Sequence, residues 1–256
     1  MRRAAAFALP ALLLAGCAAA SQAPAQTDAL TIENRYPLEY AKQFTVDVCA
    51  GGYDLITIDG SRYLVVPEGA AAPANLDADI TVLQQPIQNI YLVSSSAMDP
   101  IISIGGLGAV ALSGTQAENW YLDAVRTAME QGEIAYAGKY SAPDYETILS
   151  ADCGLAIENT MIYHTPEVKE QLEKFGVPVL VERSSYESDP LARMEWVKLY
   201  GILLGRTEEA ERVLTTLCSA LHRCWTRNPP ARLRRSSPSP QTISPRCARA
   251  AITSPR

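Results

Sequence analysis

Apolar and polar residues alternate in the first regular part of the chain. The alternation covers residues 44–48, and two further apolar-rich runs, 53–58 and 62–66, are separated by Asp59-Gly60. A period of two is typical of a strand with one buried face, and an Asp-Gly pair favours a tight hairpin turn. We therefore expect a small antiparallel β element here, followed by a loop rich in alanine and proline over 67–79.

After residue 85 the pattern changes to short apolar runs that alternate with segments of helical period. The runs predict five buried strands, at 89–93, 110–112, 134–136, 155–157 and 177–181. We expect four helices between them, of which one begins at about Met98 and one covers 166–175. Another begins with Ser141 as its cap and has Pro143 and Asp144 in its first turn. The fourth carries an apolar stripe of Trp120, Tyr121, Ala124, Val125, Ala128 and Met129. Such strand, helix, strand units form parallel sheets. The sequence therefore predicts an α/β fold, a parallel-sheet Rossmann-like lobe preceded by the small antiparallel β element.

The predicted sheet has a functional consequence, because ligands bind beyond the carboxyl ends of the strands in an open parallel sheet. We expect five loops to gather along that edge, at 94–98, 113–116, 138–141, 158–164 and 183–188. They are rich in Ser, Thr, Tyr and Met, with one His and one Arg. This composition indicates a surface for recognition more than a reaction centre.

Charge is divided unevenly along the chain. The 256 residues contain 22 Lys+Arg and 28 Asp+Glu, a net charge of −6, but residues 214–256 hold eight arginines and no acid. The remainder, 14 basic and 28 acidic residues, argues against nucleic acid as a partner, because phosphate binding favours a basic face. The basic segment, rich in Pro, Ser and Arg, has no apolar period, and we expect it to be disordered.

The N-terminus has the features of an export signal. Arg2 and Arg3 precede an apolar stretch over 4–15, which is too short to span a bilayer, and Leu14-Ala15-Gly16-Cys17 follows the pattern of a bacterial lipobox. We expect cleavage before Cys17, lipidation of its sulfur, and a flexible tether over 17–30. The mature protein is then extracytoplasmic and anchored to the cell membrane by lipid.

The remaining cysteines and histidines do not predict a metal site. Cys49 and Cys153 could pair in an oxidising compartment, although each lies in or beside an apolar run where a buried thiol is more frequent. No Cys-x-x-Cys is present, and His164 directly precedes a helix start with no second His or Cys nearby. We therefore expect no zinc or iron site and no resident cofactor.

Candidates for catalysis are equally sparse. The glycines of Gly105-Gly106-Leu107-Gly108 lie between a helix and a strand, the reverse of the order that aims a helix N-terminus at phosphate, so we expect a turn. No Gly-x-Ser-x-Gly elbow supports a Ser-His-acid triad. Arg183 and Tyr186 follow a buried strand and could meet an anionic or oxygen-rich ligand, or Arg183 could pair with Glu182 or Glu187. The residues predict no enzyme.

Three features together resemble the solute-binding proteins of ABC transporters that take up iron-siderophore complexes, heme and cobalamin. These are the lipobox, the run Pro143-Asp144-Tyr145-Glu146-Thr147-Ile148-Leu149 before Leu155-Ala156-Ile157, and the passage Leu172-Glu173-Lys174-Phe175-Gly176-Val177-Pro178-Val179. The resemblance covers roughly residues 86–213. Cys153-Gly154 departs from it, because the family often has Pro-Asp there.

The resemblance implies two α/β lobes joined by a long helix, with a metal chelate held between them and no covalent chemistry. It implies an ABC permease and its ATPase as partners, a monomeric protein, and Glu146 as a surface carboxylate that docks on the permease. For the near wall of the binding cleft we expect six residues: Ser95, Tyr140, Met161, Tyr163, Arg183 and Tyr186.

The expected organisation has six parts: a signal peptide at 1–16, the lipidated tether at 17–30, the β element and its loop at 31–85, the solute-binding lobe at 86–206, the start of an interlobe helix at 207–213, and an aberrant tail at 214–256. We expect the tail to result from a frameshift or a wrong join, which removes most of the second lobe. Two other interpretations stay open: a membrane-anchored flavodoxin-like redox or enzymatic domain, and a structural lipoprotein whose basic tail binds anionic polymer.

Overall fold

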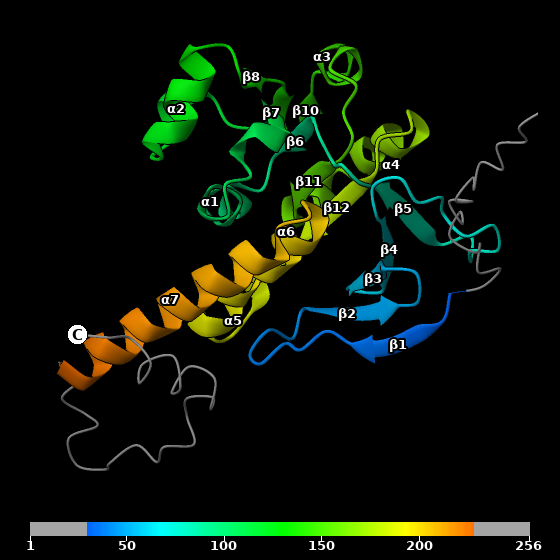
Figure 1. The fold of residues 1–256 in the computed structure, drawn as a ribbon. Coiled ribbons are helices and arrows are strands. Elements are labelled where there is room, and N and C mark those ends of the chain that lie inside the picture. The colour runs from blue at the N-terminus through cyan, green and yellow to red at the C-terminus, as the bar shows by residue number, and fades with distance from the viewer. Residues whose placement is uncertain (1–29, 228–256) are drawn as a thin grey trace, which may run out of the picture.

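The computed structural model describes residues 30–227 (Figure 1). A five-stranded N-terminal sheet lies beside an α/β body, and helix α7 runs diagonally along that body (Figure 1). The leader, Cys17, Cys247 and most of the expected tail lie outside the described residues. Within the described part, no helix is both long enough and apolar enough to cross a membrane.

The N-terminal sheet contains the predicted hairpins and two further strands. Its strands are β1 (Ile32–Arg35), β2 (Phe44–Cys49), β3 (Tyr53–Ile58), β4 (Ser61–Val66) and β5 (Ile80–Gln84), in that order. The pairs up to β4 are antiparallel, while β5 runs parallel to β4. Asp59 and Gly60, with φ of 48° and 83°, form the predicted tight turn.

Both faces of the N-terminal sheet are covered, which explains its alternating pattern. Phe44, Val46 and Ile56 point into the main core, and Cys49 and Leu64 point into a smaller cluster on the other face. The smaller cluster includes Ala70 and Leu76 of the loop between β4 and β5. The loop therefore shields a face that would otherwise meet water.

The central sheet is wholly parallel, as the sequence predicts. Its strand order is β12-β11-β6-β7-β8. The strands are β6 (Ile90–Leu92), β7 (Val110–Ser113), β8 (Ala135–Tyr136), β11 (Ala156–Asn159) and β12 (Val179–Glu182). The chain winds outward from β6 through β7 to β8, then returns to add β11 and β12 on the other side. The direction of winding therefore reverses between β6 and β11.

Helices cover both faces of the central sheet. The main core joins one face to α1 (Ser95–Ser103), α2 (Asp123–Glu130), α6 (Val197–Leu203) and α7 (Thr207–Arg227). A second core joins the other face to α3 (Tyr145–Ser150) and α4 (Pro166–Lys174). The remaining elements are α5 (Pro190–Glu195), a small ribbon of β9 (Gly138–Lys139) and β10 (Ala142–Pro143), and 3-10 turns η1 (Leu107–Ala109), η2 (Ala117–Asn119), η3 (Thr160–His164) and η4 (Ser184–Tyr186).

Two predicted helix starts are wrong. Trp120 and Tyr121 precede α2, because the Trp120 indole donates to the Ser113 hydroxyl (3.1 Å) and the Thr115 carbonyl (3.2 Å), which ties this segment to the end of β7. Ser141 does not cap α3, because it lies at the turn of the ribbon in which Pro143 pairs with Gly138.

Asp144 caps α3 in place of Ser141. Its Oδ1 accepts from the Thr147 backbone N–H at 3.1 Å, and its Oδ2 accepts from the Thr147 hydroxyl at 2.7 Å. These hydrogen bonds hold the pKa of Asp144 below its usual value. A carboxylate that accepts an N–H at a helix start satisfies a donor that the helix itself leaves free.

The expected end of the ordered chain near Val213 is also wrong. Helix α7 continues through Arg227, and Leu214 and Cys218 are buried with Ala210 in the main core. These three positions recur every four residues, so they share one helix face and pack against the body. Regular structure therefore extends into the arginine-rich segment.

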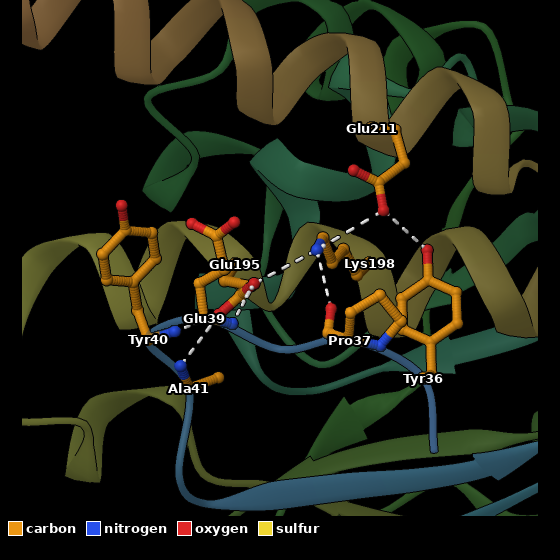
Figure 2. A network of polar contacts seen from close by, with 8 residues as sticks. All are labelled: Tyr36, Pro37, Glu39, Tyr40, Ala41, Glu195, Lys198 and Glu211. Atoms are coloured by element: carbon orange, nitrogen blue, oxygen red, sulfur yellow. Dashed lines mark hydrogen bonds and ion pairs between the residues drawn. The ribbon is translucent and has the colours of Figure 1, made fainter. Parts of the chain in front are cut away.

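Two buried carboxylates attach the N-terminal sheet to the helices. Glu195, at the end of α5 and fully buried, accepts the backbone N–H groups of Glu39 (2.9 Å), Tyr40 (2.7 Å) and Ala41 (2.9 Å) (Figure 2). Lys198 lies 3.2 Å from Glu195 and donates to the Pro37 carbonyl at 2.9 Å. Successive amides that converge on one carboxylate form an anion-binding nest.

The second carboxylate continues this arrangement along the chain. Glu187 Oε1 accepts the backbone N–H groups of Lys42 and Gln43, each at 2.9 Å, and the Trp196 indole N–H at 3.1 Å. Lys198 also lies 3.4 Å from Glu211 of α7, which accepts the Tyr36 hydroxyl at 2.9 Å (Figure 2). The segment before β2 is thus fixed to α5, α6 and α7.

The two body cysteines do not form a disulfide. Cys49 ends β2 with its side chain in the smaller cluster, Cys153 lies in the second core, and both are buried free thiols. Burial raises the pKa of each thiol. The interpretation of these residues as buried thiols is confirmed.

We predict that Glu195→Gln will destabilise the protein by about 3 kcal/mol, because an amide NH₂ then faces backbone donors and the Lys198 ammonium loses its buried partner. Glu209→Gln is the matched control, because Glu209 is partly exposed and forms a surface pair with Arg212 at 3.2 Å, for which we expect a loss of about 1 kcal/mol or less. Urea unfolding followed by circular dichroism measures both; equal losses in the two variants would contradict the role of Glu195.

Candidate functional site

The carboxyl ends of the central strands define the candidate site. Because β6, β7, β8, β11 and β12 are parallel, the loops that follow them meet at one edge, as the sequence predicts. The reversal of winding between β6 and β11 is a topological switch point, where α/β sheets place their ligands. The loops at this point begin at Val93 and Thr160.

Four of the six expected ligand residues are exposed at this edge. Ser95 is exposed at the first position of α1, and Met161 (45% exposed), Tyr163 (49%) and Tyr186 (55%) lie on the turns that follow β11 and β12. The two tyrosine rings offer contact area to a ligand at little cost in side-chain ordering, and Met161 adds a flexible thioether.

Tyr140 and Arg183 are less available. Tyr140 lies on the turn between β9 and β10 and packs partly against the second core. Arg183 is only partly exposed, and its Nη1 lies 2.7 Å from the Asp59 carboxylate, while its Nε donates to the Gln43 amide oxygen at 3.4 Å. The guanidinium also lies 4.5 Å from the centre of the Tyr186 ring. Arg183 and Tyr186 are therefore brought together, as a cation–π pair.

The ion-pair partner of Arg183 differs from the expectation. Glu182 and Glu187 were the sequence candidates, but both are buried and accept other donors. The partner is Asp59, at the β3–β4 turn, which reaches Arg183 because the N-terminal sheet packs beside β12, where the Tyr63 hydroxyl donates to the Val179 carbonyl at 3.0 Å. A contact across 124 positions leaves no signal in local sequence pattern.

Two buried acids at the site were not identified as such from the sequence. Glu182 ends β12 and is 2% exposed; it accepts the hydroxyls of Ser94 (2.9 Å) and Ser96 (2.8 Å) and the Ser184 backbone N–H (2.7 Å). The charge of Glu182 adds to burial in raising the pKa of Tyr200 on α6. The sequence contains one signal for this acid, because Glu182 directly follows the apolar strand run Val179-Leu180-Val181.

Glu158 is the second such acid, on β11. It is fully buried beside Val181 of β12, and both carboxyl oxygens lack a hydrogen-bond partner in the described structure. Desolvation raises the pKa of Glu158 to about 8. Glu158 is therefore neutral at pH 7 in the folded protein.

The remaining sequence candidates are His164, the glycine turn at Gly105 and the surface carboxylate Glu146. His164 is exposed at the end of η3, and Gly105 adopts a φ of 73° in the turn after α1, as expected of a turn. No group of three or more potential metal ligands occurs among residues 30–227. Glu146 is exposed on α3, at its second residue.

Comparison with known proteins gives distant similarities. No protein-family model matches the chain. An uncharacterized lipoprotein of Methanocaldococcus jannaschii is 21% identical over 171 residues, which cover 61% of this chain and 40% of that protein.

Two solved structures illustrate the likeness in structure. A periplasmic heme binding protein from Pseudomonas aeruginosa matches with 20% identity and a TM-score of 0.43, over 59% of this chain and 50% of its own. An iron uptake ABC transporter substrate-binding protein from Streptococcus pneumoniae matches with 14% identity and a TM-score of 0.44, over 56% and 48%. The chain is thus similar to half or less of each of these two binding proteins.

We predict that Glu158 makes stability fall as pH rises. An acid whose pKa is about 8 when folded and near 4.5 when unfolded keeps its proton only in the folded state, so its stabilisation is complete below pH 4.5 and is lost by pH 8. Glu158→Met removes the group, so the variant should gain stability relative to the wild type by up to about 1.4 kcal/mol per pH unit between pH 5 and pH 8. Urea unfolding at both pH values measures this difference; a gain independent of pH would contradict the assignment.

Proposed function

We propose that the chain is a solute-binding component of an ABC importer, which holds an iron-siderophore complex or a related metal chelate, heme or cobalamin, at the carboxyl edge of its central sheet. The observation that carries the proposal is the switch point between β6 and β11, where Ser95, Met161 and Tyr163 are exposed together. Ligand contact through hydroxyls, a thioether and aromatic rings suits a large chelate with mixed polar and apolar surface.

Capture and delivery need no bond to be made or broken. The turn η3 presents Met161 and Tyr163, while Arg183 lies against the Tyr186 ring and keeps that ring at the edge. The chelate then leaves for a permease that is driven by an ATPase. Glu146, exposed on the first turn of α3, is the residue we propose to contact the permease, in accordance with the sequence motif around it.

The strand order does not favour the flavodoxin-like alternative. Numbered along the chain, the central strands follow the order 3-2-1-4-5, whereas the flavodoxin order is 2-1-3-4-5. The loop after β6 is also Ser94-Ser95-Ser96, which has no glycine to let a phosphate approach the backbone.

We predict that Tyr163→Ala weakens chelate binding by about tenfold, or about 1.4 kcal/mol, because the ring supplies apolar contact at the edge. Ile32→Ala is the matched control, because Ile32 is a similarly exposed apolar residue (56%) on β1 of the other sheet. Isothermal titration with ferrichrome, ferric citrate, hemin and cobalamin measures the effect. Equal losses in both variants, or no binding of any of these ligands to the wild type, would contradict the proposal.

We further propose that Cys17 carries the lipid anchor, for which the lipobox and the distant lipoprotein relative are the support. We predict that Cys17→Ser moves the protein from the membrane fraction to the soluble fraction of its host cells. Cys153→Ser is the control, because Cys153 is a buried thiol inside the lobe, and this variant should stay with the membrane. Detection of the wild type in the soluble fraction alone would refute lipidation.

A further inference from the structure

Glu182 occupies an unusual position at the ligand edge. Its strand, β12, is separated by β11 from β6, yet its carboxylate reaches the serines that follow β6. Oε2 accepts from Ser94 and Ser96, and Oε1 accepts from the Ser184 backbone N–H. The carboxylate is 2% exposed and has three hydrogen-bonded partners, all of them donors.

The number of protons available for these hydrogen bonds determines the direction in which the two serine hydroxyls donate. A carboxylate has no proton to give, and each serine hydroxyl has one. The hydroxyl oxygens of Ser94 and Ser96 also lie 2.9 Å apart, so two protons serve three contacts in this triangle. Neither of these two hydroxyl protons is then left for a ligand, and the hydroxyl of the exposed Ser96 offers only lone pairs.

Neither the start of α1 nor Arg183 changes the direction in which these two hydroxyls donate. Ser94 is the N-cap residue of α1, but its hydroxyl makes no capping hydrogen bond, because it is engaged with Glu182. Arg183, the cation next in sequence to Glu182, is paired with Asp59. At the switch point, the Ser96 hydroxyl therefore has the character of a hydrogen-bond acceptor, beside the exposed Ser95 hydroxyl.

We propose that Glu182 is a positioning residue that sets the hydrogen-bond polarity of Ser96 at the ligand edge by turning the hydroxyl protons of Ser94 and Ser96 inward. At Ser96 the edge then favours a ligand group that donates, such as an amide N–H or a hydroxyl, over a free carboxylate. This inference rests on the proposed function, because it assumes that the edge is where the ligand binds.

One substitution inverts the polarity with little change in shape. In Glu182→Gln, the Ser184 backbone N–H at the Oε1 position requires an acceptor, so it fixes the amide oxygen there. The amide NH₂ then faces both serines and supplies a donor to each. Both hydroxyl protons are released to point elsewhere, and Ser96 becomes able to donate to a ligand.

The first experiment does not need a ligand. Neutron diffraction of the deuterated wild type should show the Ser94 and Ser96 hydroxyl deuterons within the triangle formed with Glu182, and in Glu182→Gln the Ser96 deuteron should point to the edge. A wild-type Ser96 deuteron that points to solvent overturns the proposal.

The second experiment compares two probes by isothermal titration: ferrichrome, a neutral ferric hydroxamate with amide N–H donors, and ferric citrate, which carries carboxylates. The ratio of their affinities should shift by about tenfold toward ferric citrate in Glu182→Gln. The shift should disappear when Ser96→Ala is added, and Glu173→Gln, a surface Glu paired with Lys169, should leave the ratio unchanged.

The outcomes separate this inference from the proposed function. An unchanged ratio in Glu182→Gln, with both probes bound, overturns the inference and leaves the proposed function standing. Failure of ferrichrome, ferric citrate, hemin and cobalamin alike to bind the wild type contradicts the proposed function, and the deuteron positions then still decide whether Glu182 sets the polarity of the serines.

Discussion

The attachment of residues 39–43 to two buried carboxylates is the constraint on which the rest of the structure depends. Glu187 and Glu195 together accept five consecutive backbone N–H groups. Each acid is removed from water, which is costly unless its oxygens are satisfied, and here the backbone amides of an irregular segment supply the donors. The result fixes the N-terminal sheet against α5 and α6, and so places the β3–β4 turn beside β12.

That placement shapes the candidate site. Asp59, on the β3–β4 turn, pairs with Arg183, and Arg183 in turn lies against the Tyr186 ring. Arg183, which the local sequence suggests as a cation for an anionic ligand, is therefore already paired with a carboxylate. The edge that remains open consists of hydroxyls, a thioether and aromatic rings, and under the proposed function these groups would contact the chelate.

Two acids on the neighbouring strands β11 and β12 show that burial alone does not determine what an acid does in the structure. Glu182 and Glu158 are both nearly inaccessible, but Glu182 has three donors and Glu158 has none in the described structure. Glu182 therefore holds the serines around it, whereas desolvation raises the pKa of Glu158 to about 8. The difference lies in what the facing strands and loops supply.

The sequence by itself determined the elements whose signal is local: the hairpin at Asp59-Gly60, the five parallel strands, the turn at Gly105 and the buried thiols of Cys49 and Cys153. It failed where a distant contact outweighed local pattern, as for Trp120 tied to β7 and for α7 continuing past Val213 by packing Leu214 on the body. Strand order, the Asp59 partner of Arg183 and the triangle of Glu182 with its serines were decided only by the tertiary structure. The physical reason is that hydrophobic periodicity shows which face of a helix or strand is buried. Which residues pack against that face depends on how the connections between strands place the elements in space.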